Sequence, residues 1–243
     1  MNPTIRSLFD RKSVRVFTDR EITAEEKAAI LKAAVEAPTA GNQQLYTILD
    51  ITDQGLKERL AVTCDNQPFI AQAKMVLIFC ADCKKWYDAY LATGCAPRKP
   101  AIGDLMLAVS DTMIAAQNAV TAAESLGIGS CYIGDVMENC AEQRALLNLP
   151  EFVFPVGMLI FGYPIQQQKD RPKPARDDQK FIVHENGYRC LSDEDLEEMW
   201  TPRCGVKSYT EWMQAFCKRK YNSEFSREMS RSVAEYLRQY EEA

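Results

Sequence analysis

The chain has 243 residues, of which 47% are hydrophobic, and it carries a formal net charge of −5. This is enough for one large domain, or two small ones, with a sizeable core. The acidic balance argues against a nucleic-acid partner, and no window approaches the roughly 18 apolar residues of a membrane span.

Cysteine and histidine usage narrows the expected chemistry. The nine cysteines show no framework spacing and the N-terminus lacks an apolar signal core, so we expect reduced thiols in the cytoplasm. Cys80 and Cys83 have C-x-x-C spacing, but Cys80 falls within a buried strand pattern, which favours a structural role. His184 is the only histidine. If the protein is an enzyme, a cofactor is therefore expected to carry the chemistry and no metal site is expected.

The first half of the chain alternates helix and strand signals. Thr23 and Glu26 form a capping box that opens a helix over residues 24–36, and Pro38 stops it. A small polar loop, APTAGNQQ, follows at residues 37–44. Two strands complete this half, over residues 46–51 and 75–81, and a polar loop over residues 64–69 lies between them.

The second half begins with a long helix over residues 103–127 that is apolar nearly all round and ends at Gly127. Such a helix must be covered on most sides, either in the core or at a subunit interface. Two strands are expected next, over residues 131–135 and 155–164. A proline-rich loop follows over residues 166–180, and helices are expected from residue 192 onwards. Interleaved helices and strands predict an α+β class in one domain.

The segment RKSVRVF, residues 11–17, gathers three cations in an acidic chain. Alternation in an extended segment places Arg11, Ser13 and Arg15 on one side. Guanidinium forks and a hydroxyl match phosphate oxygens, so the segment is either a phosphate site or a solvated charged strand. A second basic segment, RPKPAR at residues 171–176, is either a second clamp on the same anion or a hydrated loop.

Carboxamides form a second group of polar candidates. Asn42, Gln43 and Gln44 follow a glycine, and Gln67 lies in the later polar loop. Amide donors and acceptors can bind the heteroatom edge of a flat ring. The glycines of GIGSCYIGD run from helix into strand, which does not fit the dinucleotide fingerprint. They either let backbone pass close to something flat or make a turn.

Taken together and in this order, these blocks resemble one family. RKSVRVF, APTAGNQQ, the Gln67 loop, AAESLGIGSCYIGD, LIFGYP and VHENGY lie between about residue 5 and residue 190. The sequence is similar to the FMN-dependent nitroreductases, in particular the oxygen-insensitive NADPH nitroreductases and flavin reductases. The resemblance thins after residue 190, where CKRKYNSEFSR offers cations in no defined register.

The resemblance implies roles for individual residues. Arg11, Lys12, Ser13 and Arg15 match the segment that holds the FMN phosphate and ribityl chain. Arg176 matches the family's phosphate-binding arginine, and Lys173 its partner, although the spacing here is Lys-Pro-Ala-Arg and not Lys-Pro-Arg. The remaining matches lie beside the flavin ring: Thr39, Ala40, Gly41, Asn42, Gln43, Gln67, Tyr132, Ile133 and Gly134.

The resemblance also implies a fold and an activity. The expected fold is a mainly antiparallel sheet flanked by helices, in an intertwined homodimer with FMN at the interface. The expected enzyme transfers hydride from NADPH or NADH through flavin N5 to nitroaromatic, quinone or flavin acceptors, by a ping-pong mechanism. Two alternatives are a non-catalytic flavin-binding sensor or storage protein and a specialised reductase of the same superfamily.

Overall fold

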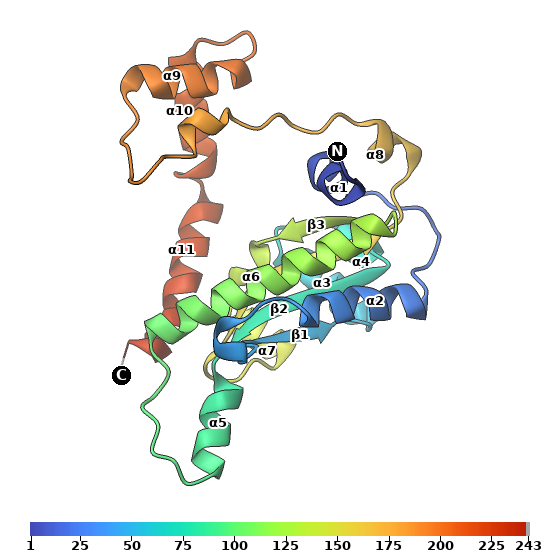
Figure 1. The fold of residues 1–243 in the computed structure, drawn as a ribbon, viewed down its shortest axis with the longest axis vertical. Coiled ribbons are helices and arrows are strands. Elements are labelled where there is room, and N and C mark those ends of the chain that lie inside the picture. Colours follow the sequence, from blue (N-terminus) through green and yellow to red (C-terminus); the bar gives the residue numbers. More distant parts are fainter. Residues whose placement is uncertain (242–243) are drawn as a thin grey trace. The chain divides into compact units, whose positions relative to one another are not determined.

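A four-stranded antiparallel sheet forms the centre of the protein (Figure 1). The computed structural model describes residues 1–241. The strand order is β1-β2-β4-β3 and every neighbouring pair is antiparallel. Their bounds are β1 Tyr46–Asp50, β2 Met75–Asp82, β3 Gly129–Ile133 and β4 Val153–Gly162. The predicted α+β class with a mainly antiparallel sheet is confirmed.

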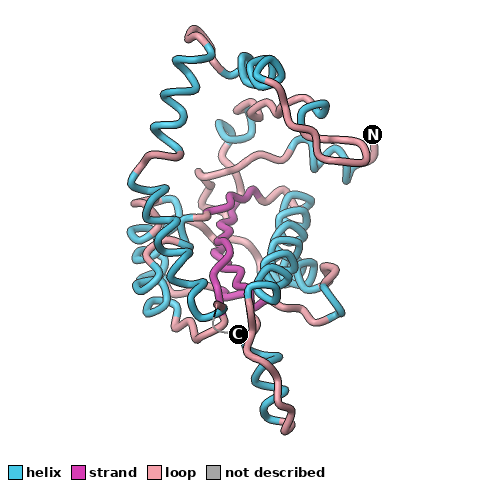
Figure 2. Tube along the Cα trace, turned by 90° about the vertical axis from the view of Figure 1, so that its left-hand side faces the viewer, coloured by secondary structure: helices cyan, strands magenta, loops and turns pink. Residues whose placement is uncertain are grey.

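Helices cover both faces of this sheet (Figure 2). Alternate residues of β2 point to opposite sides: Val76 and Ile78 belong to one hydrophobic cluster, whereas Leu77 and Phe79 belong to another. All eight residues of β2 are buried, as predicted for a strand covered on both faces. One face is covered by α3 Gln54–Thr63, α4 Phe69–Gln72 and α7 Cys140–Leu147, the other by α2 Ala24–Val35 and α6 Ile102–Ser125.

The chain divides into two compact units, residues 1–172 with the described residues from Met229 on, and Lys173–Glu228. The further helices are α1 Pro3–Asp10, α5 Lys84–Ala92, α8 Gln166–Asp170, α9 Asp193–Trp200, α10 Tyr209–Lys220 and α11 Glu224–Leu237. The single-domain interpretation, with a divergent region from about residue 191, stays a prediction. Across residues 1–241, none of the helices has the length and apolarity needed to cross a membrane.

Local sequence signals placed most elements correctly. Thr23 and Glu26 form the expected capping box at the start of α2, and Gly127 adopts φ 74° just after α6. The prediction of a continuous loop over residues 166–180 is wrong, because α8 occupies its start. This short helix is held by tertiary contacts: Gln168 is buried and its Oε1 accepts from the backbone N–H of Arg15 at 3.5 Å.

The segment of residues 11–17 lies against the ends of β3 and β4. The N–H of Val14 donates to the carbonyl of Ser130 at 2.9 Å, and Phe17 forms a bridge with Pro164. Two glycines make room for this approach: a Cβ on Gly129 would lie 2.6 Å from Val14 Cγ2, and one on Gly162 would lie 2.5 Å from Phe17 Cγ. The basic segment is therefore fixed to the sheet by backbone hydrogen bonding and by apolar contacts.

Gly162→Ala should lower the free energy of unfolding by about 1–3 kcal/mol, because the new methyl overpacks against the Phe17 ring. Gly157→Ala, on the same strand, is the matched control because its Cβ would have no neighbour within 4 Å. Urea unfolding of both variants measures the difference. Equal stability of the two variants would show that Phe17 does not pack on Gly162.

Candidate functional site

Arg11 presents unused hydrogen-bond donors in a buried position. Its guanidinium carbon lies 5.9 Å from the centroid of the Tyr132 ring. Its Nε and Nη2 are buried, and neither has a hydrogen-bond partner among the described residues. Buried guanidinium donors without partners are costly, so the surroundings of Arg11 fit an anionic group such as a phosphate.

A second guanidinium approaches the same segment from the end of α8. Arg171 Nη2 donates to the carbonyl of Ser13 at 2.5 Å, while its Nε is buried and has no partner in the described part of the chain. The side chain of Ser130, which bridges to Ser13, also has a buried Oγ without a partner there. Sequence analysis assigned Arg171 to a hydrated loop or a second clamp. The structure places it next to Ser13.

Lys12 and Arg15 differ from Arg11 in their contacts. The Lys12 ammonium donates to the carbonyls of Lys169, at 2.6 Å, and Arg171, which holds α8 beside the segment. Arg15 is exposed and its guanidinium carbon lies 5.8 Å from the Phe69 ring centroid. Arg15 therefore extends from the segment toward the start of α4, whereas Lys12 extends toward α8.

The polar loop before α4 and the end of β3 lie on the same side as the basic segment. Gln67 is half-buried and its Nε2 donates to the carbonyl of Cys64 at 2.7 Å, which fixes its carboxamide. Tyr132 donates to Gln117 Oε1 at 3.3 Å. Burial raises the pKa of Tyr132 to about 12, with Arg11 acting in the opposite direction, so the phenol is neutral. Ile133 is buried and the following Gly134 is exposed.

The loop of residues 39–43 is held elsewhere, by a buried carboxylate on α6. Asp111 is 3% exposed. It accepts from the Thr39 hydroxyl, from Ala40 N–H at 2.9 Å and from Leu45 N–H at 3.4 Å. Gly41 and Asn42 both adopt φ 56°, which is accessible mainly to glycine and asparagine. Sequence analysis missed Asp111, whose signal is a carboxylate in the middle of an apolar helix, away from the acidic residues of its first and last turns.

Within one chain, the loop of residues 39–43 and the basic segment lie at opposite corners of the sheet (Figure 1). The loop precedes Tyr46 of β1, which pairs with Ala81 of β2, and Ala81 in turn pairs with Phe154 of β4. Ser130, beside Ser13, aligns with Phe161. From strand spacings, the corners are about 24 Å apart along the strands and about 14 Å across them. The structure therefore brings Arg11, Ser13, Arg15, Gln67 and Tyr132 to one side but leaves residues 39–43 apart.

Lys173 and Arg176 belong to the second compact unit. Arg176 is exposed, and its Nη1 donates to the carbonyl of Pro174 at 3.2 Å. In the same unit His184 Nδ1 accepts from Arg189 N–H at 3.1 Å, whereas its Nε2 is buried and has no hydrogen-bond partner among the described residues. The phosphate-binding roles of Lys173 and Arg176 stay predictions.

Comparison with known proteins identifies the class to which this arrangement belongs. Residues 8–163 match the Nitroreductase family, a range that includes the basic segment, the Gln67 loop and β3. The chain belongs to this family. The expected resemblance is thereby confirmed.

Individual relatives cover most of the chain. It is 36% identical over 212 residues to an oxygen-insensitive NADPH nitroreductase of Salmonella typhimurium, covering 84% of this chain and 85% of that protein. It is 31% identical over 238 residues to an FMN reductase [NAD(P)H] of Bacillus subtilis, covering 97% and 91%. The NADPH:FMN oxidoreductase of Vibrio harveyi, solved in complex with NAD+, superimposes with a TM-score of 0.82 at 26% identity, covering 97% and 98%.

Asp111→Asn should lower the free energy of unfolding by about 1–3 kcal/mol, because the amide cannot accept from all three buried donors of the loop. Asp88→Asn is the control, since Asp88 forms only an exposed i,i+4 pair with Lys84, and such pairs contribute little. Urea unfolding measures both variants. A loss for Asp111→Asn no larger than for Asp88→Asn would contradict the anchoring role.

Thiol labelling should separate exposed from buried cysteines. Burial raises the pKa of Cys64, Cys80 and Cys83 to about 12, so their reactive thiolate is scarce at pH 8. Iodoacetamide should label the native protein at no cysteine other than Cys95, Cys190 and Cys217, which are exposed. Peptide mass spectrometry locates the adducts. Rapid labelling of Cys80 or Cys83 would contradict the structural role assigned to that pair.

Proposed function

We propose that this protein is an FMN-dependent NAD(P)H oxidoreductase. The observation that carries the proposal is the set of buried guanidinium donors without a partner among the described residues, Nε and Nη2 of Arg11 and Nε of Arg171, in a chain of the Nitroreductase family. Their donors suit the phosphate of FMN. The names of the Salmonella typhimurium, Bacillus subtilis and Vibrio harveyi relatives support the same activity. Bound FMN would supply reversible uptake of two electrons and a proton.

The residues of the chain would bind and orient this cofactor. Arg11 and Arg171 would hold the phosphate together with Ser13, and Arg15 would extend the positive charge along the segment. Lys12 would act indirectly, because its ammonium fixes the carbonyls of Lys169 and Arg171. The remaining proposed contacts are to the ring and come from Gln67 and from Tyr132, Ile133 and Gly134.

The proposal includes a homodimer with FMN at the interface. A single chain separates the loop of residues 39–43 from the basic segment by more than the length of the cofactor, so the loop that flanks the ring would come from the partner. Exposed apolar side chains on α6 support a covered surface: Met106, Leu107, Met113 and Ile114 are 58%, 52%, 38% and 41% exposed. Obligate interfaces bury large apolar areas of this kind.

The proposed reaction takes one hydride equivalent from NADPH or NADH and delivers it to a second substrate. With a quinone, the quinone, one proton and NAD(P)H become the hydroquinone and NAD(P)+. Nitroaromatics and flavins are the other proposed acceptors. Both substrates would use one face of the ring in turn, which gives ping-pong kinetics. All nine cysteines are unpaired, in keeping with the cytoplasmic location that we also propose.

The visible spectrum of the purified protein and its response to NADPH test this function. We expect a yellow protein with one noncovalent FMN per chain that bleaches within its turnover time when NADPH is added under nitrogen. A protein that binds flavin but bleaches slowly or not at all would be a sensor or storage protein. Release of FAD, or no flavin after reconstitution, would overturn the cofactor assignment.

Arg11→Ala should weaken FMN binding about tenfold to a hundredfold, because a charge-assisted hydrogen bond contributes about 1.5–3 kcal/mol. Riboflavin lacks the phosphate, so its affinity should hardly change. Arg6→Ala, which removes an exposed arginine of α1, is the control. Titration of each apoprotein with both flavins measures the effect.

The same titration examines the second unit. Arg176→Ala is expected to follow the pattern of Arg11→Ala, and Lys173→Ala to have a much smaller effect. If Lys173→Ala loses FMN and Arg176→Ala does not, the match of this segment to the family is out of register. Equal losses of riboflavin and FMN would assign a general structural role to these residues.

A further inference from the structure

The turn that carries Gln67 has a backbone conformation that few residues adopt. Two consecutive residues with positive φ precede Gln67: Asp65 at 60° and Asn66 at 51°. This conformation costs free energy in residues other than glycine, although aspartate and asparagine tolerate it best. The turn closes back onto α3, because Asn66 N–H donates to the carbonyl of Val62 at 3.2 Å and Gln67 N–H to that of Ala61 at 2.8 Å. Such a turn keeps one conformation only where its surroundings hold it.

Two carboxamides near the start of α7 hold the end of α3, directly before this turn. Asn139 Nδ2 donates to the carbonyl of Thr63 at 3.1 Å. Gln143 Nε2 donates to Thr63 Oγ1 at 3.0 Å and lies 3.7 Å from Cys64 Sγ. The carbonyl of Cys64 accepts in turn from Gln67 Nε2 at 2.7 Å. The carboxamide of Gln67 is therefore linked to α7 through Thr63 and Cys64.

Gln143 is buried in a way that stability alone does not favour. Its side chain is 0% exposed, and its Oε1 has no hydrogen-bond partner among residues 1–241. A buried acceptor without a partner costs free energy, whereas a methionine would fill a similar space without that cost. The Thr63 hydroxyl donates to the carbonyl of Leu60 at 3.4 Å, so Thr63 Oγ1 is left to accept from Gln143. The Nε2 donor is thus the feature of Gln143 that an apolar side chain would not supply.

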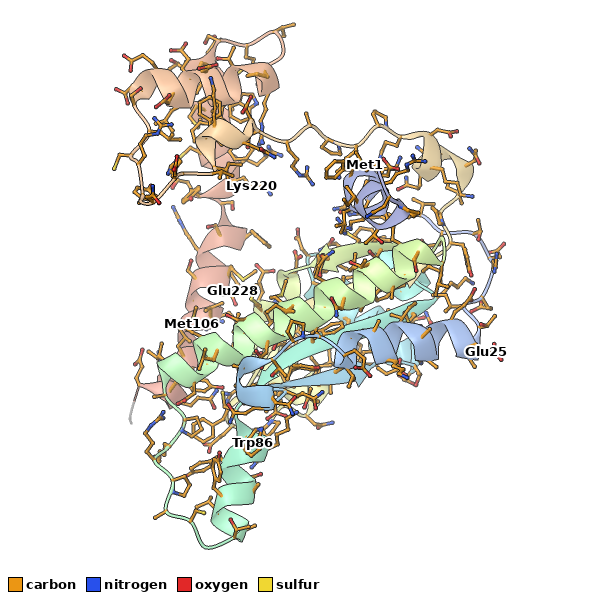
Figure 3. All side chains as sticks on the ribbon, in the orientation of Figure 1. Met1, Glu25, Trp86, Met106, Lys220 and Glu228 are labelled. Carbon is orange, nitrogen blue, oxygen red and sulfur yellow. The ribbon has the colours of Figure 1, made fainter. Side chains whose placement is uncertain are left out.

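This support lies on the opposite face of the sheet from the anchor of the loop of residues 39–43. Cys64 belongs to the hydrophobic cluster that α3, α4 and α7 form with one face of the sheet. Asp111 lies on α6, which covers the other face, and Figure 3 labels Met106 on the same helix. A substitution at Gln143 therefore leaves the contacts of Asp111 in place.

We propose that Gln143 is a positioning residue, which fixes the turn of residues 63–67 and thereby orients the Gln67 carboxamide toward the flavin ring. Because Gln143 is fully buried, it would act only through Thr63 and Cys64. A side chain that is already held in one orientation loses less conformational entropy when it binds a ligand. Gln143 would in this way strengthen binding of the ring without contact to it. The effect on the ring, unlike the support of the turn, rests on the proposed function.

Hydrogen exchange of the flavin-free protein, followed by NMR, tests the support of the turn. In Gln143→Met the amide protons of Asn66 and Gln67 should exchange about three- to tenfold faster, because a hydrogen bond that holds the turn is lost. Thr63→Val, which removes the acceptor instead, should have the same effect. Glu142→Met, at an exposed position of the same helix, should leave the rates unchanged. Unchanged rates in Gln143→Met, or an equal acceleration throughout β2 from a loss of global stability, would overturn the proposal.

Titration of the apoprotein with riboflavin, which has the ring but no phosphate, tests the link to the ring. Gln143→Met should weaken riboflavin binding about three- to tenfold. In a chain that already carries Gln67→Ala it should have no further effect, because the residue that it positions is absent. A further loss of the same size would show that Gln143 does not act through Gln67. A parent protein that binds neither FMN nor riboflavin would refute the proposed function, and the exchange rates would still decide whether Gln143 holds the turn.

Discussion

The contact on which the site depends contains no polar side chain. Val14 packs where Gly129 has no Cβ and Phe17 packs where Gly162 has none, so the segment between them is fixed against the ends of β3 and β4. This attachment, together with the backbone hydrogen bond from Val14 to Ser130, places Arg11 beside Tyr132 and Ser13 beside Ser130. Without this attachment the segment would be a solvated charged strand, because ion pairs of an exposed arginine contribute little free energy.

A second constraint follows from the sheet order. β1 and β3 are opposite edges, and the loop of residues 39–43 is tied to the β1 edge by Asp111 and Trp86. The basic segment is tied to the β3 edge. The proposed cofactor, which uses both, would therefore lie between two chains, and the exposed apolar residues of α6 would be covered in that dimer.

Local signals in the sequence were sufficient for the four strands, for helices such as α2 and α6, and for part of the site. The capping box of Thr23 and Glu26 acts through neighbours in the sequence, and the apolar run of residues 75–81 in β2 acts through burial. Both were predicted correctly. The helix α8, the role of Asp111 and the position of Arg171 depend on partners more than 60 residues away. Such contacts leave no periodic pattern, so reasoning from the sequence missed them.

A mixing experiment tests the shared site most directly. Arg11→Ala chains, expected to bind FMN weakly, are unfolded together with Asp111→Asn chains and refolded as mixed dimers. Asp111→Asn removes the anchor of the loop of residues 39–43, so it should also weaken FMN binding if that loop flanks the ring. If one cofactor uses the basic segment of one chain and the loop of the other, each heterodimer regains one intact site, and the mixture recovers about a quarter of the parent FMN capacity. If each site lies within a single chain, every site carries a substitution. Mixing would then restore no FMN binding, which would contradict the account.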